Sequence, residues 1–334
     1  MRGIPSADPT AVDAAVAWHC GDPFAEQRML AEGRGAVDLS HRDVIAVAGA
    51  DRLSWLDSMT SQLLLDLKPG DCTYDLLLDP HGRVEAELHL HDDGQQTLIT
   101  LEPGNAATVV EFLDRMRFML RVDVRDVTAE YAVVWEPKRE VHPEFPTILT
   151  PAAFAGLSMG DVGADVSRYT APRSHPWRGR EVLVPRPRLD EYLDRVDGLA
   201  GSWAWNALRV AAGVPRFGVE TDHKTIPHEV GWLGTAVHMR KGCYRGQETV
   251  ARTHNMGKPP RRLVLLHLDG SLDQLPAHGT EVLHGERPIG FLGMAVQHYE
   301  LGPIASAVVK RNTPIDAVLE VAGMQASQDV VVNA

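Results

Sequence analysis

The chain has 334 residues, 44% of them hydrophobic, and a formal net charge of −12 at pH 7. This length and composition exclude a disordered chain and predict two or three packed units. The apolar runs, such as residues 263–266 and 330–332, fall far short of the roughly 20 residues that a membrane helix needs. The surplus of acids disfavours indiscriminate binding to nucleic acid or anionic lipid. We therefore expect a soluble protein with no membrane partner and no direct nucleic-acid partner.

The N-terminal segment and the cysteines bear on the cellular compartment. In the first 24 residues Pro, Asp or Gly interrupts every apolar run, so the continuous apolar segment of a secretory signal is absent. Cys20, Cys72 and Cys243 are an odd number at wide spacing, which argues against a disulfide framework or a Cys-x-x-Cys site. We expect a cytoplasmic protein.

The first 125 residues predict an alternation of strands and helices. Residues 83–91 alternate apolar and polar side chains, the pattern of a strand with one buried face. Residues 79–82, DPHG, predict the turn of a hairpin before that strand. Apolar residues also recur at helical spacing. In chain order the predicted elements are a strand at 44–47, a helix over 53–63, hairpin strands at 73–78 and 83–91, a strand at 97–101 and a helix over 109–120.

The composition and apolar pattern of the sequence change twice in the remainder of the chain. Residues 136–180 are rich in Pro and Gly without a sustained period, which indicates a surface excursion or a small weakly ordered subdomain near a domain boundary. Amphipathic helices are predicted over 189–196 and 202–212. Beyond Pro260, short apolar runs separated by Gly, Pro and Asn predict a small antiparallel barrel, so the fold class is α+β. The barrel strands are expected at 263–268, 281–284, 289–296, 305–310 and 317–321.

Two histidines lie close together in the second hairpin strand. His89 and His91 stand at i and i+2, so they could share a metal ion with a nearby carboxylate. A solvated strand end is the alternative, and we favour it.

The densest chemical signal is KGCYRGQE at residues 241–248. If this segment is extended, Lys241, Cys243 and Arg245 project to one side, and the two cations would lower the pKa of the thiol. Gly242 and Gly246 permit a close backbone approach or a positive-φ turn. The alternative is a small buried thiol in a tight turn, which free cysteines commonly are.

The octapeptide also opens a basic stretch. Residues 240–262 hold seven Lys or Arg residues and a single acid, so the stretch carries a net charge of +6. From charge alone, a solvated basic face and an anion-binding site both remain open.

KGCYxGQE followed by a basic segment resembles the signature of the YgfZ family, relatives of the glycine-cleavage T-proteins. Further stretches resemble the wider T-protein superfamily, and the landmarks span about residues 36–310. These stretches are VDLSH at 37–41, GAD at 49–51, LRVAAGVP at 208–215 and IPHE at 226–229. The resemblance implies a three-domain cloverleaf around a central folate cavity, with domain 1 formed by residues 1–125 together with 201–258, domain 2 by 126–200 and the barrel by 259–334.

The resemblance also implies a folate site. Glu229 stands where T-proteins use a glutamate to bind the pterin, and a carboxylate suits that role because it accepts two hydrogen bonds from the pterin edge. Trp205 matches a tryptophan that lines the folate site, and Lys258 stands where T-proteins place an arginine against the folate glutamate tail. Cys243 would be the reactive thiol at the mouth of the cavity. The remaining candidates for folate contact are Lys241, Tyr244, Arg252 and Arg262.

Two departures from the family pattern shape the expected activity. T-proteins carry an Asp-Asp pair in the hairpin, whereas this chain has Ala86 and Glu87, so we expect the inward position to lack the catalytic carboxylate. Arg42 replaces a folate-stacking tryptophan of one family member.

The sequence therefore predicts an accessory protein rather than a classical aminomethyltransferase. It would bind tetrahydrofolate or another reduced folate and support the assembly or repair of iron–sulphur enzymes, and so indirectly tRNA modification, with those enzymes or assembly factors as partners. One alternative is a tetrahydrofolate-dependent aminomethyltransferase of the glycine-cleavage type. Another is a binding module without folate that uses the +6 segment.

Overall fold

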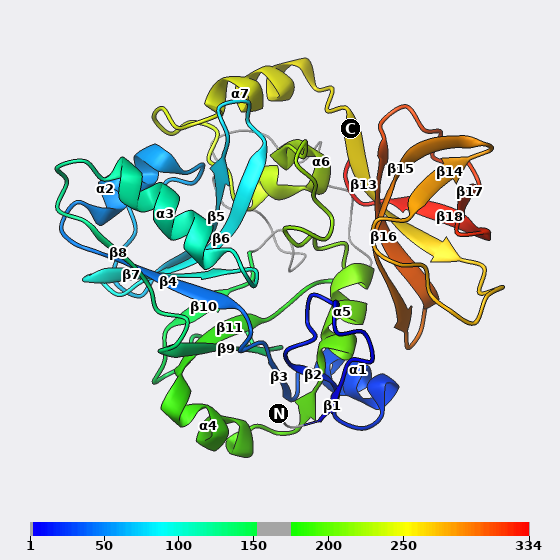
Figure 1. Cartoon of the computed structure of the whole chain (residues 1–334), viewed down its shortest axis with the longest axis horizontal. Coiled ribbons are helices and arrows are strands. Elements are labelled where there is room, and N and C mark those ends of the chain that lie inside the picture. Colours follow the sequence, from blue (N-terminus) through cyan, green and yellow to red (C-terminus); the bar gives the residue numbers. More distant parts are fainter. Residues whose placement is uncertain (1–2, 152–174, 334) are drawn as a thin grey trace. The chain divides into compact units, whose positions relative to one another are not determined.

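The computed structural model describes residues 3–151 and 175–333 (Figure 1). These residues divide into two compact units, each with its own cores. Residues 78–85, the tip of the predicted hairpin, belong to the second unit. The first unit comprises Met1–Leu77, Ala86–Pro151 and Arg178–Trp205, and the second comprises the described parts of Leu78–Glu85, Ala152–Trp177 and Asn206–Ala334.

The first unit contains a five-stranded sheet in the order β5-β6-β7-β4-β8. Two helices, α2 (Arg52–Met59) and α3 (Ala106–Met116), pack on one face of it and bury an apolar cluster with the strands. The strands are β4 (Asp43–Ala48), β5 (Cys72–Leu78), β6 (Val84–Asp92), β7 (Gln96–Leu101) and β8 (Asp123–Asp126). The predicted hairpin is therefore the β5–β6 pair, and the helix predicted over 109–120 ends at Met116.

A second five-stranded sheet of the first unit has the order β10-β11-β9-β3-β12. Helix α4 (Leu189–Arg195) packs against it through Tyr192 and Leu193. The strands are β3 (Ala36–Asp38), β9 (Tyr131–Glu136), β10 (Thr147–Leu149), β11 (Arg180–Pro185) and β12 (Leu199–Ala200). A ribbon of β1 (Ile4–Pro5) and β2 (Ala17–His19), helix α1 (Pro23–Ala31) and the short 3-10 helix η2 (Arg186–Arg188) complete this unit.

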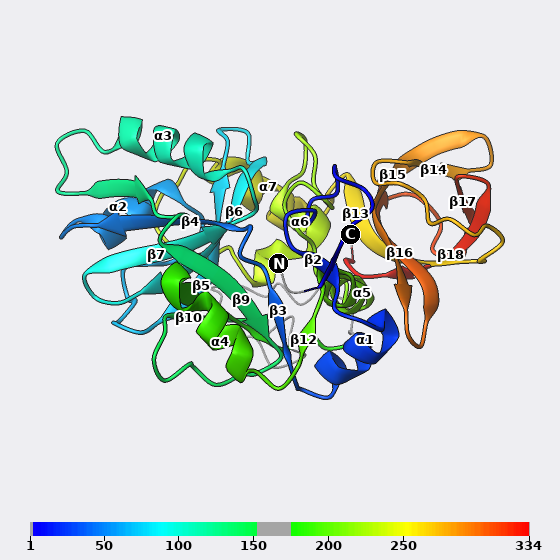
Figure 2. The ribbon, with the colours of Figure 1, turned by 60° about the horizontal axis from the view of Figure 1, so that its bottom comes forward.

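The two sheets of the first unit lie against each other through polar side chains. His89 of β6 contacts Glu181 of β11, and His91 of β6 contacts the Thr147 carbonyl of β10. In Figure 2, α3 lies on one side of the first sheet, and β9 with α4 lies on the other. Strand β6 is thus buried on both faces, whereas the alternating pattern predicted one. The second face is buried because β11 supplies charged partners for its polar residues.

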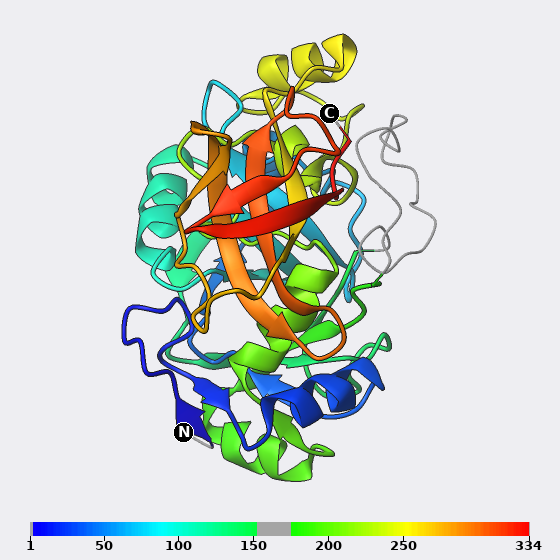
Figure 3. The same ribbon diagram turned by 90° about the vertical axis from the view of Figure 1, so that its right-hand side faces the viewer.

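The second unit ends in a closed six-stranded barrel, β13-β16-β15-β14-β17-β18 (Figure 3). Its interior is filled by alternate apolar residues such as Val264, Leu266 and Val309. The strands are β13 (Arg261–Leu268), β14 (Glu281–His284), β15 (Arg287–His298), β16 (Gly302–Lys310), β17 (Leu319–Val321) and β18 (Met324–Val330), all paired antiparallel. The predicted α+β class and C-terminal barrel are confirmed.

Short helices contain two of the motifs singled out in the sequence. Helix α5 (Ser202–Ala211) is the predicted helix at 202–212, and α6 (Pro227–Val230) with the 3-10 helix η3 (Trp232–Gly234) contains the IPHE motif. Helix α7 (Gln247–Met256) was not predicted. Of the region 136–180, residues 152–174 lie outside the described part, and the rest contributes β10 and the start of β11. Within the described residues, no helix has the length and apolar character required to cross a bilayer.

Candidate functional site

The KGCYRGQE segment is a turn that leads into α7. Lys241 is buried and Cys243 is exposed, so the two side chains do not share one face. The condition of an extended segment is not met, since residues 241–246 form no strand, Gly246 takes a φ of +82° and α7 begins at the next residue. What the segment presents is an exposed free thiol.

The two cations beside Cys243 contact other groups. Arg245 Nη1 donates to Glu85 Oε2 at 2.6 Å, and the Lys241 ammonium lies 5.4 Å from the centre of the Tyr244 ring. Lys241 and Tyr244, both proposed to contact folate, are therefore brought together as a buried cation–aromatic pair. The thiol flanked by two cations on one strand face is not formed.

The hairpin tip at Leu78–Glu85 packs against this turn through two glycines. A Cβ on Gly246 would lie 2.5 Å from the Asp79 carbonyl oxygen, and a Cβ on Gly82 would lie 2.8 Å from Thr249 Cβ. Both glycines also have positive φ, so any other residue would meet both strain and a clash. The flexibility of Gly246 was expected, but its partner Asp79 lies 167 residues earlier in the chain, and no local signal reveals it.

Glu229 is fully buried in α6 and is held by Arg261. Arg261 Nε donates to Oε1 at 2.9 Å, and its Nη2 donates to Oε2 at 2.8 Å. The Ile226 amide also donates to Oε2, at 3.2 Å. A carboxylate offers about four acceptor positions, so one remains, on Oε1. A pterin edge needs two acceptors, and Glu229 can supply them only if Arg261 or the Ile226 amide gives up its bond.

Arg261 connects Glu229 to a second carboxylate. Its Nη1 and Nη2 donate to Asp222 at 2.7 and 2.9 Å. Burial would raise the pKa of Asp222, but the Arg261 hydrogen bonds lower it well below its ordinary value. From the sequence, Arg261 was counted only among the cations of the +6 segment, and its pairing with Glu229 was missed because the two residues lie 32 positions apart.

The other basic candidates lie in different settings. Lys258 and Arg252 are exposed, Arg252 on α7 and Lys258 just after its end. Arg262 is buried and donates to the carbonyls of Arg311 and Thr313 at 2.8 and 2.7 Å. Those bonds tie barrel strand β13 to the loop after β16.

Trp205 belongs to the first unit and is buried. The Arg42 guanidinium lies over its ring, 5.6 Å from the centroid. Arg42, which the sequence placed where a relative has a stacking tryptophan, thus contacts an aromatic face itself. Any flat ligand that stacks on this face of Trp205 must compete with a cation–π contact.

Arg42 is part of a cluster of buried polar side chains between the two sheets. Its Nη1 and Nη2 donate to Glu181 at 2.7 Å and to Glu102 at 2.5 Å. His89 Nδ1 lies 2.8 Å from Glu181 Oε1, and its Nε2 lies 3.4 Å from Glu87 Oε1. Tyr74 stacks on the His89 ring with centroids 3.6 Å apart. All six side chains are less than 10% exposed.

The electrostatics of this cluster favour the charged forms of His89 and Glu181. Burial would lower the pKa of His89, but Glu181 and Glu87 raise it to about 9. Burial would raise the pKa of Glu181, but His89 and Arg42 lower it to about 2. At neutral pH the His89 imidazolium and the Glu181 carboxylate therefore form a buried ion pair.

Ala86 and Glu87, which replace the Asp-Asp pair, lie on opposite faces of strand β6. Ala86 belongs to the apolar cluster under α2 and α3, whereas Glu87 lies on the opposite face beside His89. The lack of a carboxylate at Ala86 therefore carries no argument against chemistry on the polar face. The expected solvated end at His89 and His91 is also wrong, since both are buried, and among the described residues no group of three metal-type ligands can hold an ion.

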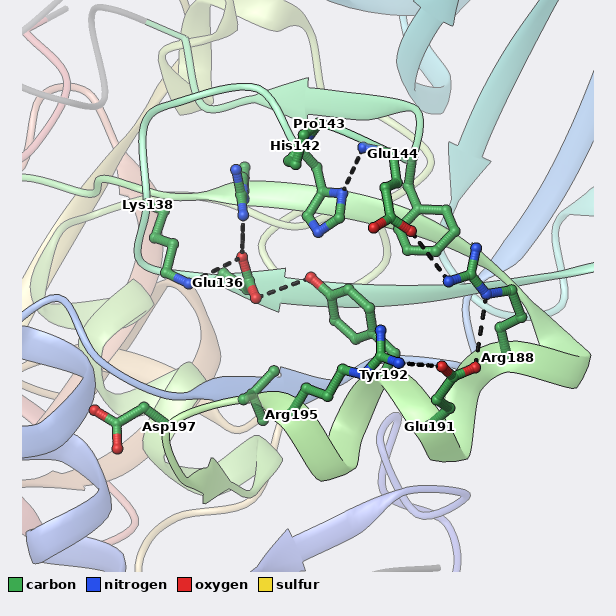
Figure 4. A pocket seen from close by; sticks show the side chains of 13 residues that line it. Glu136, Lys138, His142, Pro143, Glu144, Arg188, Glu191, Tyr192, Arg195 and Asp197 are labelled. Carbon is green, nitrogen blue, oxygen red and sulfur yellow. Dashed lines mark hydrogen bonds and ion pairs between the residues drawn. The ribbon is translucent and has the colours of Figure 1, made fainter.

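A separate cavity of about 340 Å³ lies beside α4 in the first unit (Figure 4). Its floor is the buried Glu136, which accepts from Arg180 at 2.6 Å and from the Tyr192 hydroxyl at 2.9 Å. On the rim, Arg188 pairs with Glu144 and Glu191. The charges that line this cavity satisfy one another, which is typical of a structural network.

The fold defines the class of the protein. A crystal structure of the glycine cleavage system aminomethyltransferase T from Bartonella henselae matches with a TM-score of 0.71 at 18% identity, over 92% of this chain and 88% of that one. The chain therefore has the aminomethyltransferase fold. Residues 20–135 match the family model described as the GCVT N-terminal domain.

Curated relatives with three kinds of name match the sequence. An aminomethyltransferase of Synechocystis is 26% identical over 80% of this chain and 74% of its own length. An iron-sulfur cluster assembly factor IBA57 homolog of Mycosarcoma maydis is 25% identical over 68% of this chain. A putative chloroplastic transferase of Arabidopsis thaliana is 25% identical over 70% of this chain. The chain spans little more than half the length of the latter two, 55% and 56%.

The family match divides the candidate residues. Arg42, Tyr74, Glu87, His89 and Glu102 lie inside residues 20–135. The candidates from the octapeptide and the folate motif, residues 205–262, lie outside it. Glu181, the shared partner of Arg42 and His89, also lies outside it, so the family model covers five of the six residues of the polar cluster.

Proposed function

We propose that this protein is a cytoplasmic folate-binding accessory protein of the YgfZ type, which supports the assembly or repair of iron–sulphur enzymes. The similarity to IBA57 homologs supports the iron–sulphur role, and the aminomethyltransferase fold supports a reduced folate as the ligand. The observation that carries the proposal is the exposed free thiol of Cys243 in the octapeptide turn. An exposed thiol is open to a protein partner, to iron or to a one-carbon unit.

The proposed folate contacts follow from the residues that the resemblance assigns. Glu229 offers one acceptor position to the pterin, and release of Arg261 would add a second. Trp205 would supply a stacking face, and the exposed Lys258 and Arg252 suit the anionic glutamate tail. Arg261 already binds Glu229, and the Arg42 guanidinium already lies over the Trp205 ring. We therefore expect the affinity for folate to be modest.

The central test is genetic complementation. Deletion of the gene should lower the activity of a cluster-dependent enzyme such as a tRNA methylthiolase or a dehydratase. Wild-type protein should restore it, and Cys243→Ala should not. Cys20→Ala is the matched control, since Cys20 is also an exposed cysteine, and it should restore activity. Full rescue by Cys243→Ala would refute the role of this thiol, and no effect of the deletion would refute the iron–sulphur function.

Folate binding is tested separately by calorimetric titration with tetrahydrofolate. Binding that is weakened by Trp205→Ala or Lys258→Ala supports the ligand. Absence of binding at high micromolar folate would instead favour a binding module that uses the +6 segment.

A second candidate is a tetrahydrofolate-dependent aminomethyltransferase. It is favoured by Glu87, a carboxylate on the polar face of β6 beside the His89 imidazolium, where proton transfer can be arranged. The assay is folate-dependent release of ammonia from an aminomethylated lipoyl carrier protein. Robust turnover that Glu87→Gln abolishes would establish the enzyme and overturn the accessory function.

A further inference from the structure

The cavity beside α4 contains a lysine that has an ion-pair partner but no hydrogen-bond acceptor. The Lys138 ammonium lies 3.8 Å from Glu136 Oε2, which is beyond hydrogen-bond distance. That oxygen already accepts from Arg180 Nε at 2.9 Å and from Arg180 Nη2 at 2.6 Å. Among the described residues the ammonium makes no hydrogen bond, so its three N–H groups are available to a ligand.

A second donor at the cavity is the imidazole of His142. The Glu144 amide donates to His142 Nδ1 at 3.1 Å, so the neutral ring carries its proton on Nε2. Burial, together with Arg180 and Lys138, lowers the pKa of His142, and the ring is therefore neutral at pH 7. Within the described part of the chain Nε2 has no acceptor, and Figure 4 shows it on the side of the ring that faces Tyr192.

The lining of the cavity has a small surplus of positive charge. Four cations and four acids line it, but Asp197 lies 3.8 Å from Arg34, which is not part of the lining. The other charges are four cations against three acids, a sum of +1. A ligand with one negative charge suits this lining, whereas a phosphate dianion would be repelled more strongly by the three acids.

One wall of the cavity is aromatic. His142 stacks on Phe145 with ring centroids 5.0 Å apart, and Tyr192 meets Phe145 edge-on at 5.7 Å. Val196 adds an aliphatic side chain. Such a wall favours a flat apolar body over a fully hydrated ion. The volume of about 340 Å³ lies at the lower end of the roughly 300–1,000 Å³ typical of small-molecule sites.

We propose that this cavity binds a small organic carboxylate with a flat apolar body. The carboxylate accepts from the Lys138 ammonium and from His142 Nε2, and the body packs against the aromatic wall. One carboxylate offers about four acceptor positions, so it satisfies both donors at once. The site is independent of the proposed function, because none of the residues assigned to folate or to the reactive thiol lines this cavity.

Titration of the intact chain with benzoate, benzamide and benzylamine tests the class of ligand. Benzoate should bind with a dissociation constant of about 1 mM or lower, measured by ligand-observed NMR. Benzamide has the same shape without the charge and should bind about 10-fold more weakly or less. Benzylamine, a cation of similar size, should not compete with benzoate.

Three variants locate the bound benzoate. Lys138→Met and His142→Phe, which keeps an aromatic ring, should each weaken binding about 10-fold or more. Lys68→Met removes an exposed lysine of the first unit outside the cavity and should leave binding unchanged. Because Lys138 is 46% exposed, Lys138→Met should unfold at the same temperature as the wild type.

Four results would overturn the proposal. The first is no benzoate binding at about 10 mM, and the second is equal affinity for benzoate and benzamide. The third is a folded Lys138→Met variant that binds benzoate as tightly as the wild type. The fourth is displacement of benzoate by an equal concentration of inorganic phosphate, which would indicate a site for phosphate.

Discussion

The buried polar cluster of the first unit and the octapeptide turn of the second unit contain similar residue types in opposite settings. In the cluster, Arg42, His89 and Glu181 are buried and hold one another in fixed hydrogen bonds. In the turn, Cys243 is exposed and Arg245 makes a partly exposed ion pair with Glu85. The difference shows that a dense sequence motif does not by itself indicate where charges interact most strongly. Burial decides that, because screening by water weakens the exposed pair.

The largest expected effect is the loss of one carboxylate from the cluster. Glu181→Gln leaves Arg42 and His89 buried without their shared partner, so we expect a loss of about 3–5 kcal/mol in the free energy of unfolding. Glu85→Gln breaks the exposed pair with Arg245 and should cost under about 1 kcal/mol. Urea unfolding followed by circular dichroism measures both. Equal losses would remove the contrast between the two regions.

The pH dependence of stability tests the same cluster. The folded pKa of His89, about 9, exceeds its ordinary value of 6.5, so its contribution is fully present below pH 6.5 and is lost as the pH rises through 9. The expected loss is about 3 kcal/mol. It should be seen in urea unfolding between pH 6 and 10 as a steeper decline for the wild type than for His89→Asn. Parallel curves would mean that His89 is not charged in the folded protein.

The close approach of the hairpin tip to the octapeptide turn gives a smaller effect. Gly246→Ala forces a Cβ into the Asp79 carbonyl at a φ of +82°, so we expect a loss of about 2–3 kcal/mol. Gly279→Ala is the matched control, with a φ of +78° but open space around its Cβ, and should lose only about 1 kcal/mol. Thermal unfolding compares them. A similar loss in both would show that the tip does not pack on the turn.

The prediction with the smallest expected effect on the structure concerns the order in which the cysteines are alkylated. Burial and the nearby Glu26 raise the pKa of Cys20 to about 11, so roughly one Cys20 thiol in a thousand is ionised at pH 8. Burial also raises the pKa of Cys72. Mass spectrometry after limited iodoacetamide treatment should find Cys243 modified first. Faster modification of Cys20 would contradict the accessibility of the octapeptide thiol.

Local patterns predicted the elements that depend on near neighbours. The barrel strands were recognised because each alternates apolar and polar residues over a few positions, and the hairpin because DPHG breaks the chain between two such runs. The three-domain division with a folate cavity, and the folate roles of Trp205, Glu229 and Lys258, remain predictions.

The sequence by itself determined the α+β class, the barrel and the residue types available for chemistry, since these follow from short-range periodicity and composition. Only the tertiary structure decided which residues act together. Arg42 meets Glu181 across 139 residues and His89 meets it across 92, so no local pattern could show that this polar face is buried. Likewise, Gly246 turns the octapeptide into α7 against a hairpin tip far away in the chain. Long-range partners set burial, and burial sets the strength of each charge interaction.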